Sequence, residues 1–201
     1  MPELLIEALE EDLAGIRSYM NALPNLKQHK KQTFWLHKDQ KPRTAIEVAI
    51  KRLSKFANLG DTYLGAEWWT QQVDGGPGGK LGFHVDKDEG IASNQQYLVH
   101  SEYSSVFYLT DTGGGTLVLD QWSPNGNGYT PAIPEHAELI FPARNKYLLF
   151  KGELLHGVIP GEDTHGTSRQ TFLINFWPRK PDAPNCLAGV YLYMYISLFL
   201  S

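Results

Sequence analysis

Residues 103–119 read YSSVFYLTDTGGGTLVL and contain two runs of β-forming residues separated by a turn with three consecutive glycines. The first run ends at Thr110 and the second begins at Gly115. Tyrosine, valine, phenylalanine and threonine favour strands, and a short glycine-rich segment between two such runs closes a hairpin. The stretch therefore predicts two neighbouring antiparallel strands.

Similar runs occur on both sides of this stretch, and turn-forming residues separate them. They are GAEWWTQQV (65–73), LGFHVD (81–86), AELIFP (137–142), KYLLFKG (146–152), LHGVIPG (155–161) and RQTFLINFW (169–177). About eight short strands with no long helix between them favour an antiparallel sandwich or jelly roll.

The first third of the chain predicts helices instead. A second helix is expected over residues 44–57, where Thr44 and Glu47 have the spacing of a capping box. A first helix is expected from the apolar positions Leu5, Leu9, Leu13, Ile16 and Met20, and Pro24 would end it. We expect one domain, 1–201: a helical buttress over 1–64, a jelly-roll core over 65–180 and an apolar tail over 181–201.

Composition limits the classes of partner and compartment. The net charge is −4 and no Lys/Arg-rich block occurs, which argues against a nucleic-acid partner. Cys186 is the only cysteine, so neither an internal disulfide nor a cysteine-based zinc cluster is possible. The N-terminal MPELLIEALEEDLAG is acidic, unlike a secretory signal or a transit peptide. These features predict a cytoplasmic protein.

Residues 187–201, LAGVYLYMYISLFLS, form an uncharged apolar end. A membrane-spanning helix needs about 20 residues, so this segment is short for one. Three interpretations stay open: a terminal strand or helix packed on the domain, a membrane-associated tail, or an unusual end of the reading frame.

His84, Asp86 and His156 are candidate metal ligands. Residues at i and i+2 of a strand point to the same face, so His84 and Asp86 are expected to aim at one ion. His156, on a later predicted strand, would complete a set of two imidazoles and one carboxylate. That set, with positions left open, is typical of oxygen-activating Fe(II), whereas zinc prefers a nearly closed tetrahedral shell.

Arg169 and Thr171 share one face of the last predicted strand. A guanidinium fork with a nearby hydroxyl suits the far carboxylate of a dicarboxylate. Strict alternation also places Leu173, Asn175 and Trp177 on that face. Asn175 would then contact cosubstrate or substrate, or be a satisfied core amide.

The pattern His84-x-Asp86, His156 and Arg169-x-Thr171, with FYLTDTGGGTLVL (107–119) and LLFKGELLHGVIPG (148–161), resembles a known family. It is similar to the Fe(II)/2-oxoglutarate-dependent dioxygenases, in particular their prolyl-hydroxylase-like branch. The resemblance covers about residues 66–180 and implies the double-stranded β-helix fold.

The resemblance also implies an activity. Fe(II), 2-oxoglutarate and O2 are the implied cofactors, with ascorbate in support. His84, Asp86 and His156 would be the catalytic metal ligands, and Arg169 and Thr171 would bind 2-oxoglutarate. Tyrosine hydroxyls often assist the cosubstrate in this family, and we favour Tyr108 over Tyr103. The implied reaction hydroxylates a C–H bond of a peptide or small molecule and releases succinate and CO2.

Two departures leave the substrate open among peptidyl proline, another protein side chain and a small metabolite. Many prolyl hydroxylases carry lysine where this chain has Arg169, and they tend to carry tyrosine shortly before the HxD, where this chain reads KLGF (80–83). The presence of Asp86 favours hydroxylation over halogenation. Alternatives are a metal- and 2-oxoglutarate-binding sensor module with little catalysis, motivated by the apolar tail, and a cupin-type oxygenase without a keto acid.

Several other residues receive structural interpretations. One of Trp68 and Trp69 should face the core and the other the surface or the cleft. Asp88 and Glu89 are expected as loop charges near the entrance. The remaining histidines are expected to be structural; they are His29, His37, His100, His136 and His165. Of these, only His165 is expected near the entrance of the site, because it lies in the loop between His156 and Arg169.

Overall fold

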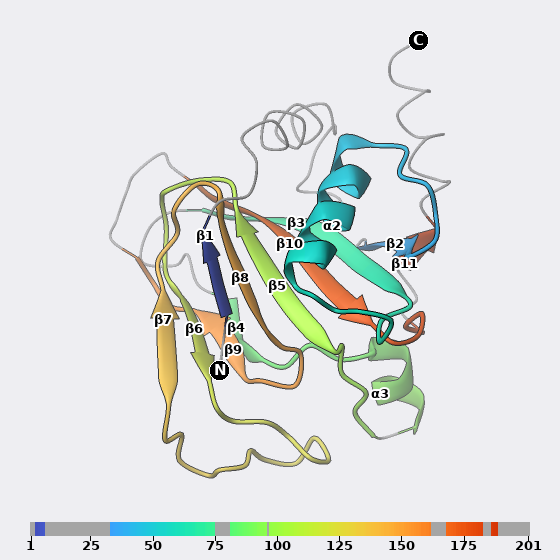
Figure 1. Cartoon of the computed structure of the whole chain (residues 1–201). Coiled ribbons are helices and arrows are strands. Elements are labelled where there is room, and N and C mark those ends of the chain that lie inside the picture. The colour runs from blue at the N-terminus through green and yellow to red at the C-terminus, as the bar shows by residue number, and fades with distance from the viewer. Residues whose placement is uncertain are drawn as a thin grey trace.

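The computed structural model describes residues 3–6, 33–74, 81–95, 97–161, 168–182 and 186–188. Their strands form two sheets that face each other (Figure 1). The larger sheet has the order β1 (Glu3–Ile6), β8 (Lys146–Lys151), β5 (Tyr103–Tyr108), β10 (Ser168–Trp177), β3 (Gly65–Asp74), β2 (Thr33–His37) and β11 (Cys186–Ala188). The smaller sheet has the order β4 (Leu81–His84), β9 (His156–Val158), β6 (Thr116–Leu119) and β7 (Ala137–Ile140).

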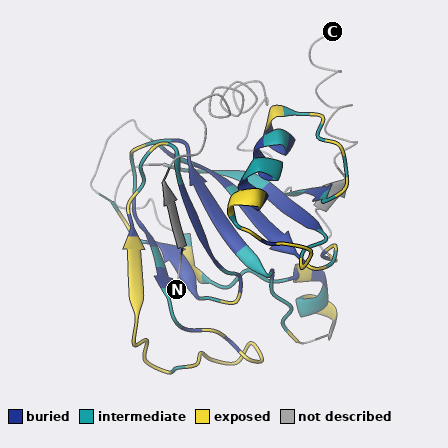
Figure 2. Ribbon diagram, in the orientation of Figure 1, coloured by how far each residue is buried: buried dark blue, intermediate teal, exposed yellow. Residues whose placement is uncertain are grey.

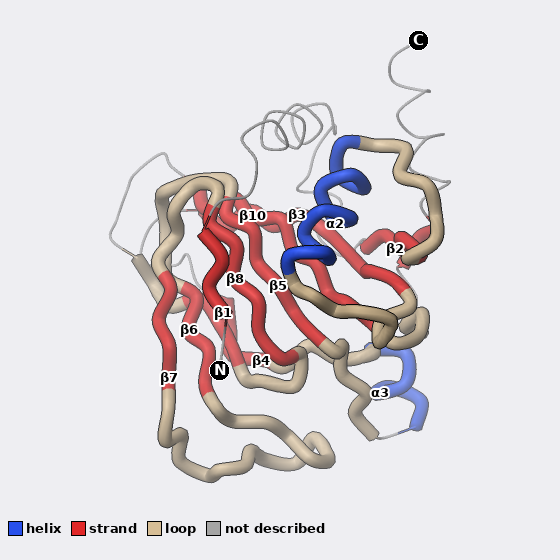
Figure 3. The backbone as a smooth tube through the Cα atoms, viewed as in Figure 1, coloured by secondary structure: helices blue, strands red, loops and turns tan. Residues whose placement is uncertain are grey.

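The chain passes repeatedly from one sheet to the other. β3, β5, β8 and β10 belong to the larger sheet, while β4, β6, β7 and β9 belong to the smaller one. These eight strands pair antiparallel wherever they are neighbours. The predicted mainly-β fold of two antiparallel sheets is confirmed, and the loop over residues 120–136 joins β6 to β7 beyond the sheets (Figure 3).

The outer face of the larger sheet is covered by α2 (Ala45–Phe56), and the main core lies between them. Ile46 and Ile50 of the helix belong to the same buried cluster as Trp68 and Phe172. The Trp68 ring stacks on Phe34 with centroids 4.6 Å apart and meets Phe172 edge-on at 5.8 Å. Burying side chains of this size contributes about 1.5–3 kcal/mol each. Figure 2 shows this burial concentrated in the central strands, whereas β7 is largely exposed.

The predicted second helix is confirmed. The Thr44 hydroxyl accepts a hydrogen bond from the Glu47 amide at 3.2 Å, as expected of an N-cap. The Glu47 carboxylate accepts instead from the Arg43 amide at 2.5 Å, one residue before the position that a capping box requires. The cap is therefore one-sided, but it still satisfies an otherwise unpaired amide.

The predicted N-terminal buttress needs correction. Glu3–Ile6, expected within the first helix, form strand β1 and pair antiparallel with β8, and β2 is a second strand inside the expected helical region. β1 lies at one edge of the larger sheet and β2 lies between β3 and β11, so their conformation is decided by partner strands rather than by local periodicity. Residues 7–32, which contain the rest of the first predicted helix, lie outside the described residues.

Cys186–Ala188 form β11, which pairs parallel with β2. This start of the apolar tail is thus a strand, and residues 189–201 lie outside the described part of the chain. Within the described residues, no helix is both long and apolar enough to cross a bilayer. A short helix not expected from the sequence, α3 (Glu89–Gln95), follows His84 and Asp86 in the chain.

Candidate active site

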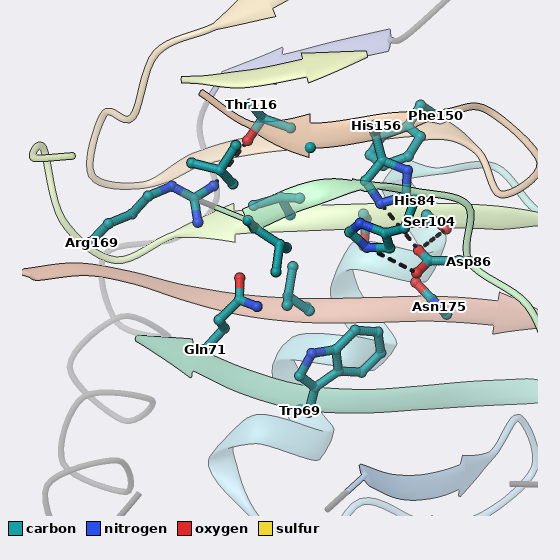
Figure 4. A pocket seen from close by; sticks show the side chains of 16 residues that line it. Trp69, Gln71, His84, Asp86, Ser104, Thr116, Phe150, His156, Arg169 and Asn175 are labelled. Carbon is teal, nitrogen blue, oxygen red and sulfur yellow. Dashed lines mark hydrogen bonds and ion pairs between the residues drawn. The ribbon is translucent and has the colours of Figure 1, made fainter. Parts of the chain in front are cut away.

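The smaller sheet brings the two candidate histidine ligands together. His84 ends β4 and His156 begins β9, and the two residues are direct partners in the antiparallel pairing of these strands. Their rings lie 4.4 Å apart. The Asp86 carboxylate lies beside both rings, with Oδ1 3.9 Å from His84 Nε2 and Oδ2 3.7 Å from His156 Nε2 (Figure 4). One ligand atom from each residue can therefore reach a common ion.

Backbone carbonyls orient both imidazoles. His84 Nδ1 lies 2.8 Å from the Gly82 carbonyl, and His156 Nδ1 lies 2.9 Å from the Leu154 carbonyl. A carbonyl only accepts, so each Nδ1 carries a hydrogen, and in the neutral tautomer that this fixes the lone pair is on Nε2. Burial lowers the pKa of His156 and so favours its neutral form, which is the form that binds metal. The donor set fits an ion bound by two histidines and one carboxylate.

Asp86 reaches the site differently from the prediction. β4 ends at His84, and Asp86 lies in the loop that follows. Strand alternation therefore does not place its carboxylate, and the expected i, i+2 strand geometry is wrong. The carbonyl of Asp86 accepts a hydrogen bond from His100 Nδ1 at 2.7 Å, which fixes the loop at this point.

Arg169 lies at the other end of the same cavity and is only 2% exposed. Its Nη2 donates to Thr116 Oγ1 at 2.9 Å, and its Nη1 lies 3.5 Å from Thr171 Oγ1. Among the described residues, the Arg169 Nε has no hydrogen-bond partner and no carboxylate forms an ion pair with the guanidinium. Buried charges are normally paired, so this guanidinium fits an anionic ligand such as a carboxylate.

Thr116 is a site residue that the sequence reasoning missed. Its hydroxyl oxygen accepts from Arg169 and also from the Tyr108 hydroxyl, which lies 2.7 Å away. Tyr108 is fully buried, with its ring 5.2 Å from the Arg169 guanidinium, and burial raises the pKa of its hydroxyl. Thr171 contacts Arg169, and Tyr108 contacts both Arg169 and Thr116, but neither residue is among those that line the cavity. The available signal was position: Thr116 directly follows the three glycines.

Those glycines allow the turn to approach Arg169 closely. Gly113 has φ +97°, and a Cβ there would lie 2.6 Å from Arg169 Cβ. A Cβ on Gly114 would collide with the carbonyl oxygen of Ile159. The turn therefore packs against the aliphatic part of the Arg169 side chain as well as joining two strands.

The cavity has a volume of about 130 Å³. A single water needs about 10–15 Å³ on this measure, so a small organic acid has room between the histidines and Arg169. Trp69, Gln71, Leu173 and Asn175 form the wall contributed by β3 and β10 (Figure 4). Trp68 faces the core and Trp69 the cavity, in agreement with the prediction that one of the two faces the core and the other the surface or the cleft. Asn175 pairs across the sheet with Glu67 on one side and Ser104 on the other.

The expected loop charges behave differently from each other. Asp88 is fully buried, and its carboxylate accepts from the Ile91 amide, the Asp182 amide and Arg179, so its expected place as an entrance charge is wrong. Glu89 is exposed and lies 3.7 Å from Lys87. His29 and His165 lie outside the described residues.

No protein-family model and no curated protein sequence matches this chain. Solved structures do match its fold. A prolyl-4-hydroxylase from Pseudomonas putida is 15% identical with a TM-score of 0.56, over 89% of this chain and 88% of that one. EctD from S. alaskensis, solved with 2-oxoglutarate and 5-hydroxyectoine, is 17% identical with a TM-score of 0.57, over 94% and 83%.

HygX from Streptomyces hygroscopicus, solved with nickel and 2-oxoglutarate, is 12% identical with a TM-score of 0.52, over 88% of this chain and 81% of that one. At these identities the likeness establishes the fold. The chain therefore has the same fold as these oxygenase structures, in agreement with the fold that the resemblance implied.

Proposed function

We propose that this protein is an Fe(II)- and 2-oxoglutarate-dependent dioxygenase that hydroxylates a C–H bond of a peptide or small molecule. One observation carries the proposal. A single cavity holds a His–Asp–His group with two free imidazole lone pairs and, at its other end, a buried guanidinium without a carboxylate partner among the described residues. We also assign the two facing sheets, between which the chain repeatedly crosses, to the double-stranded β-helix.

The residues at the two ends of the cavity would have different roles. His84, Asp86 and His156 would hold the iron, and Arg169 with Thr116 would hold the far carboxylate of 2-oxoglutarate. Bound together with O2, iron and 2-oxoglutarate supply an oxidation that releases succinate and CO2 and hydroxylates the substrate. Arg169 fixes the position and plane of the carboxylate because its donors form a rigid fork.

Apolar residues of the cavity lining have a second role, the exclusion of water. Val106, Phe150 and Leu173 are apolar residues that line the cavity, and the Phe150 ring packs against His156 with centroids 4.7 Å apart. Apolar side chains here keep water out of the space between metal and guanidinium, which strengthens the electrostatic contacts made there. Trp69 and Gln71 face the same space from β3 and are available to a substrate.

The proposal is tested by binding and by turnover. Isothermal titration of the purified protein with Mn(II), then with 2-oxoglutarate, should show both bind, and Fe(II)-dependent succinate formation should follow in air. His156→Ala should abolish metal binding and succinate formation. A wild-type protein that binds neither Mn(II) nor 2-oxoglutarate would overturn the proposal. Binding of both without succinate from any substrate panel would favour the sensor module instead.

A further inference from the structure

The metal-ligand loop leaves Asp86 without strand pairing of its own, because β4 ends two residues earlier. A carboxylate in a loop rotates freely unless other groups restrain it, and a restrained ligand binds metal more tightly. The restraint on Asp86 therefore decides how well the three ligands are prepared for an ion.

The β5 strand supplies such a restraint. Ser104 is 1% exposed, and its hydroxyl donates to Asp86 Oδ2 at 2.6 Å (Figure 4). The Asp86 side chain is only 14% exposed, so water screens this contact little. A short hydrogen bond to an ionised acceptor is among the stronger ones in proteins. Asp86 Oδ1 accepts no hydrogen bond from a described residue, and it is the oxygen nearer to His84.

A second hydroxyl supports the first. Ser101 is also buried, and its oxygen lies 3.1 Å from that of Ser104. Because Ser104 donates to Asp86, Ser101 is the donor in this pair. Gly152, in the turn before β9, makes room for Ser101, since a Cβ there would collide with the serine side chain. The same turn provides the Leu154 carbonyl that orients His156.

We infer that Ser104 is a positioning residue for the metal: its hydroxyl holds the Asp86 carboxylate beside the two imidazoles and leaves Oδ1 as the ligand oxygen. This inference rests on the proposed function, because it assumes that the three residues bind a metal. Ser104 contacts the ligand and not the ion, so it acts through Asp86.

The test compares two neighbouring serines. Ser104→Ala removes the hydroxyl that faces Asp86. Ser105→Ala is the matched control, since Ser105 is equally buried but donates to the Ile174 carbonyl at 2.8 Å. Ser104→Thr keeps a hydroxyl at the same position. Mn(II) dissociation constants are measured by isothermal titration calorimetry, and thermal unfolding is measured for each variant without metal.

We expect Ser104→Ala to weaken Mn(II) binding by about 10- to 100-fold, as loss of a partner of a metal ligand generally does. Ser105→Ala should bind Mn(II) like the wild type, and Ser104→Thr should recover most of the lost affinity. Equal Mn(II) affinity of Ser104→Ala and wild type would overturn the inference and leave the proposed function intact. Wild-type protein that binds no Mn(II) would overturn both. Mn(II) binding with the expected order of variants, but no turnover, would overturn only the oxygenase.

Discussion

At the residue scale, Thr116 is the group on which the cosubstrate end of the cavity depends. Thr116→Val removes the oxygen that accepts from both Arg169 and Tyr108, so Arg169 Nη2 loses this partner and the Tyr108 hydroxyl keeps only the Ile140 carbonyl, 3.5 Å away. Each such loss costs about 1–3 kcal/mol. We expect the affinity for 2-oxoglutarate to fall by at least about tenfold, the equivalent of about 1.4 kcal/mol, with Mn(II) affinity unchanged.

Tyr108→Phe is the control for Thr116→Val, because it removes a donor to Thr116 but leaves the Arg169 contact in place. Its effect on 2-oxoglutarate affinity, measured by titration calorimetry in the presence of Mn(II), should be the smaller of the two. Loss of 2-oxoglutarate affinity in Tyr108→Phe but not in Thr116→Val would contradict the role given to Thr116.

Glu67 is a second residue whose role can be measured, through the pH dependence of the stability of the protein. It is 6% exposed and bonds to the Thr33 hydroxyl at 2.6 Å. Burial, with smaller contributions from Asp86 and Asp88, raises the pKa of its carboxyl from 4.5 to about 7. The folded state therefore binds more protons than the unfolded state between these values. The stability that this adds is full below about pH 4.5 and is lost as pH rises through about 7.

Glu67→Gln should remove this pH dependence. We expect the free energy of unfolding of the wild type, relative to the variant, to fall by up to about 3 kcal/mol between pH 4.5 and pH 8. Urea unfolding of both proteins at several pH values, with a chelator present, measures the difference. Parallel pH profiles for the two proteins would rule out a raised pKa at Glu67.

At the scale of elements, the glycine turn between β5 and β6 supports Arg169. Gly113→Ala places a methyl group against the arginine side chain at a φ of +97°. Gly128→Ala is matched, because its φ is +110° but no atom lies within 4 Å of the added carbon. Both should lose about 1–2 kcal/mol of stability to backbone strain. We expect only Gly113→Ala to weaken 2-oxoglutarate binding, as measured by titration in the presence of Mn(II).

Some elements of the fold could be predicted from the sequence and others could not. The strands β3 to β10 follow from local β-forming runs between turns, and α2 follows from its apolar face and Thr44. β1 and β2 were not predictable, because each forms against strands that are distant in sequence: β1 pairs with β8 at the sheet edge, and β2 lies between β3 and β11. Thr116 was missed for a related reason: its role depends on Arg169, which is 53 residues away.

At the scale of the whole molecule, the site depends on how the loop after β4 is joined to the rest of the chain. Asp88, two residues after Asp86, accepts from the amide of Asp182 at 2.8 Å and from Arg179 Nη2 at 2.5 Å. These partners follow β10, the strand that carries Arg169. The buried Asp88 carboxylate therefore connects the metal end of the cavity to the segment that follows the C-terminal end of β10.

Asp88→Ala should test this connection. Removing one partner of a buried ion pair costs about 3–5 kcal/mol, and the lower end applies because Arg179 is partly exposed and can turn to water. Glu89→Ala is the control, since its pair with Lys87 is exposed and is worth at most about 1 kcal/mol. Because α3 and the Asp86 loop share the Asp88 contacts, the Asp88 variant should also bind Mn(II) more weakly, whereas the Glu89 variant should not. Urea unfolding and Mn(II) titration of the two variants provide the comparison. Equal stability of the two would show that the carboxylate at position 88 does not hold the loop.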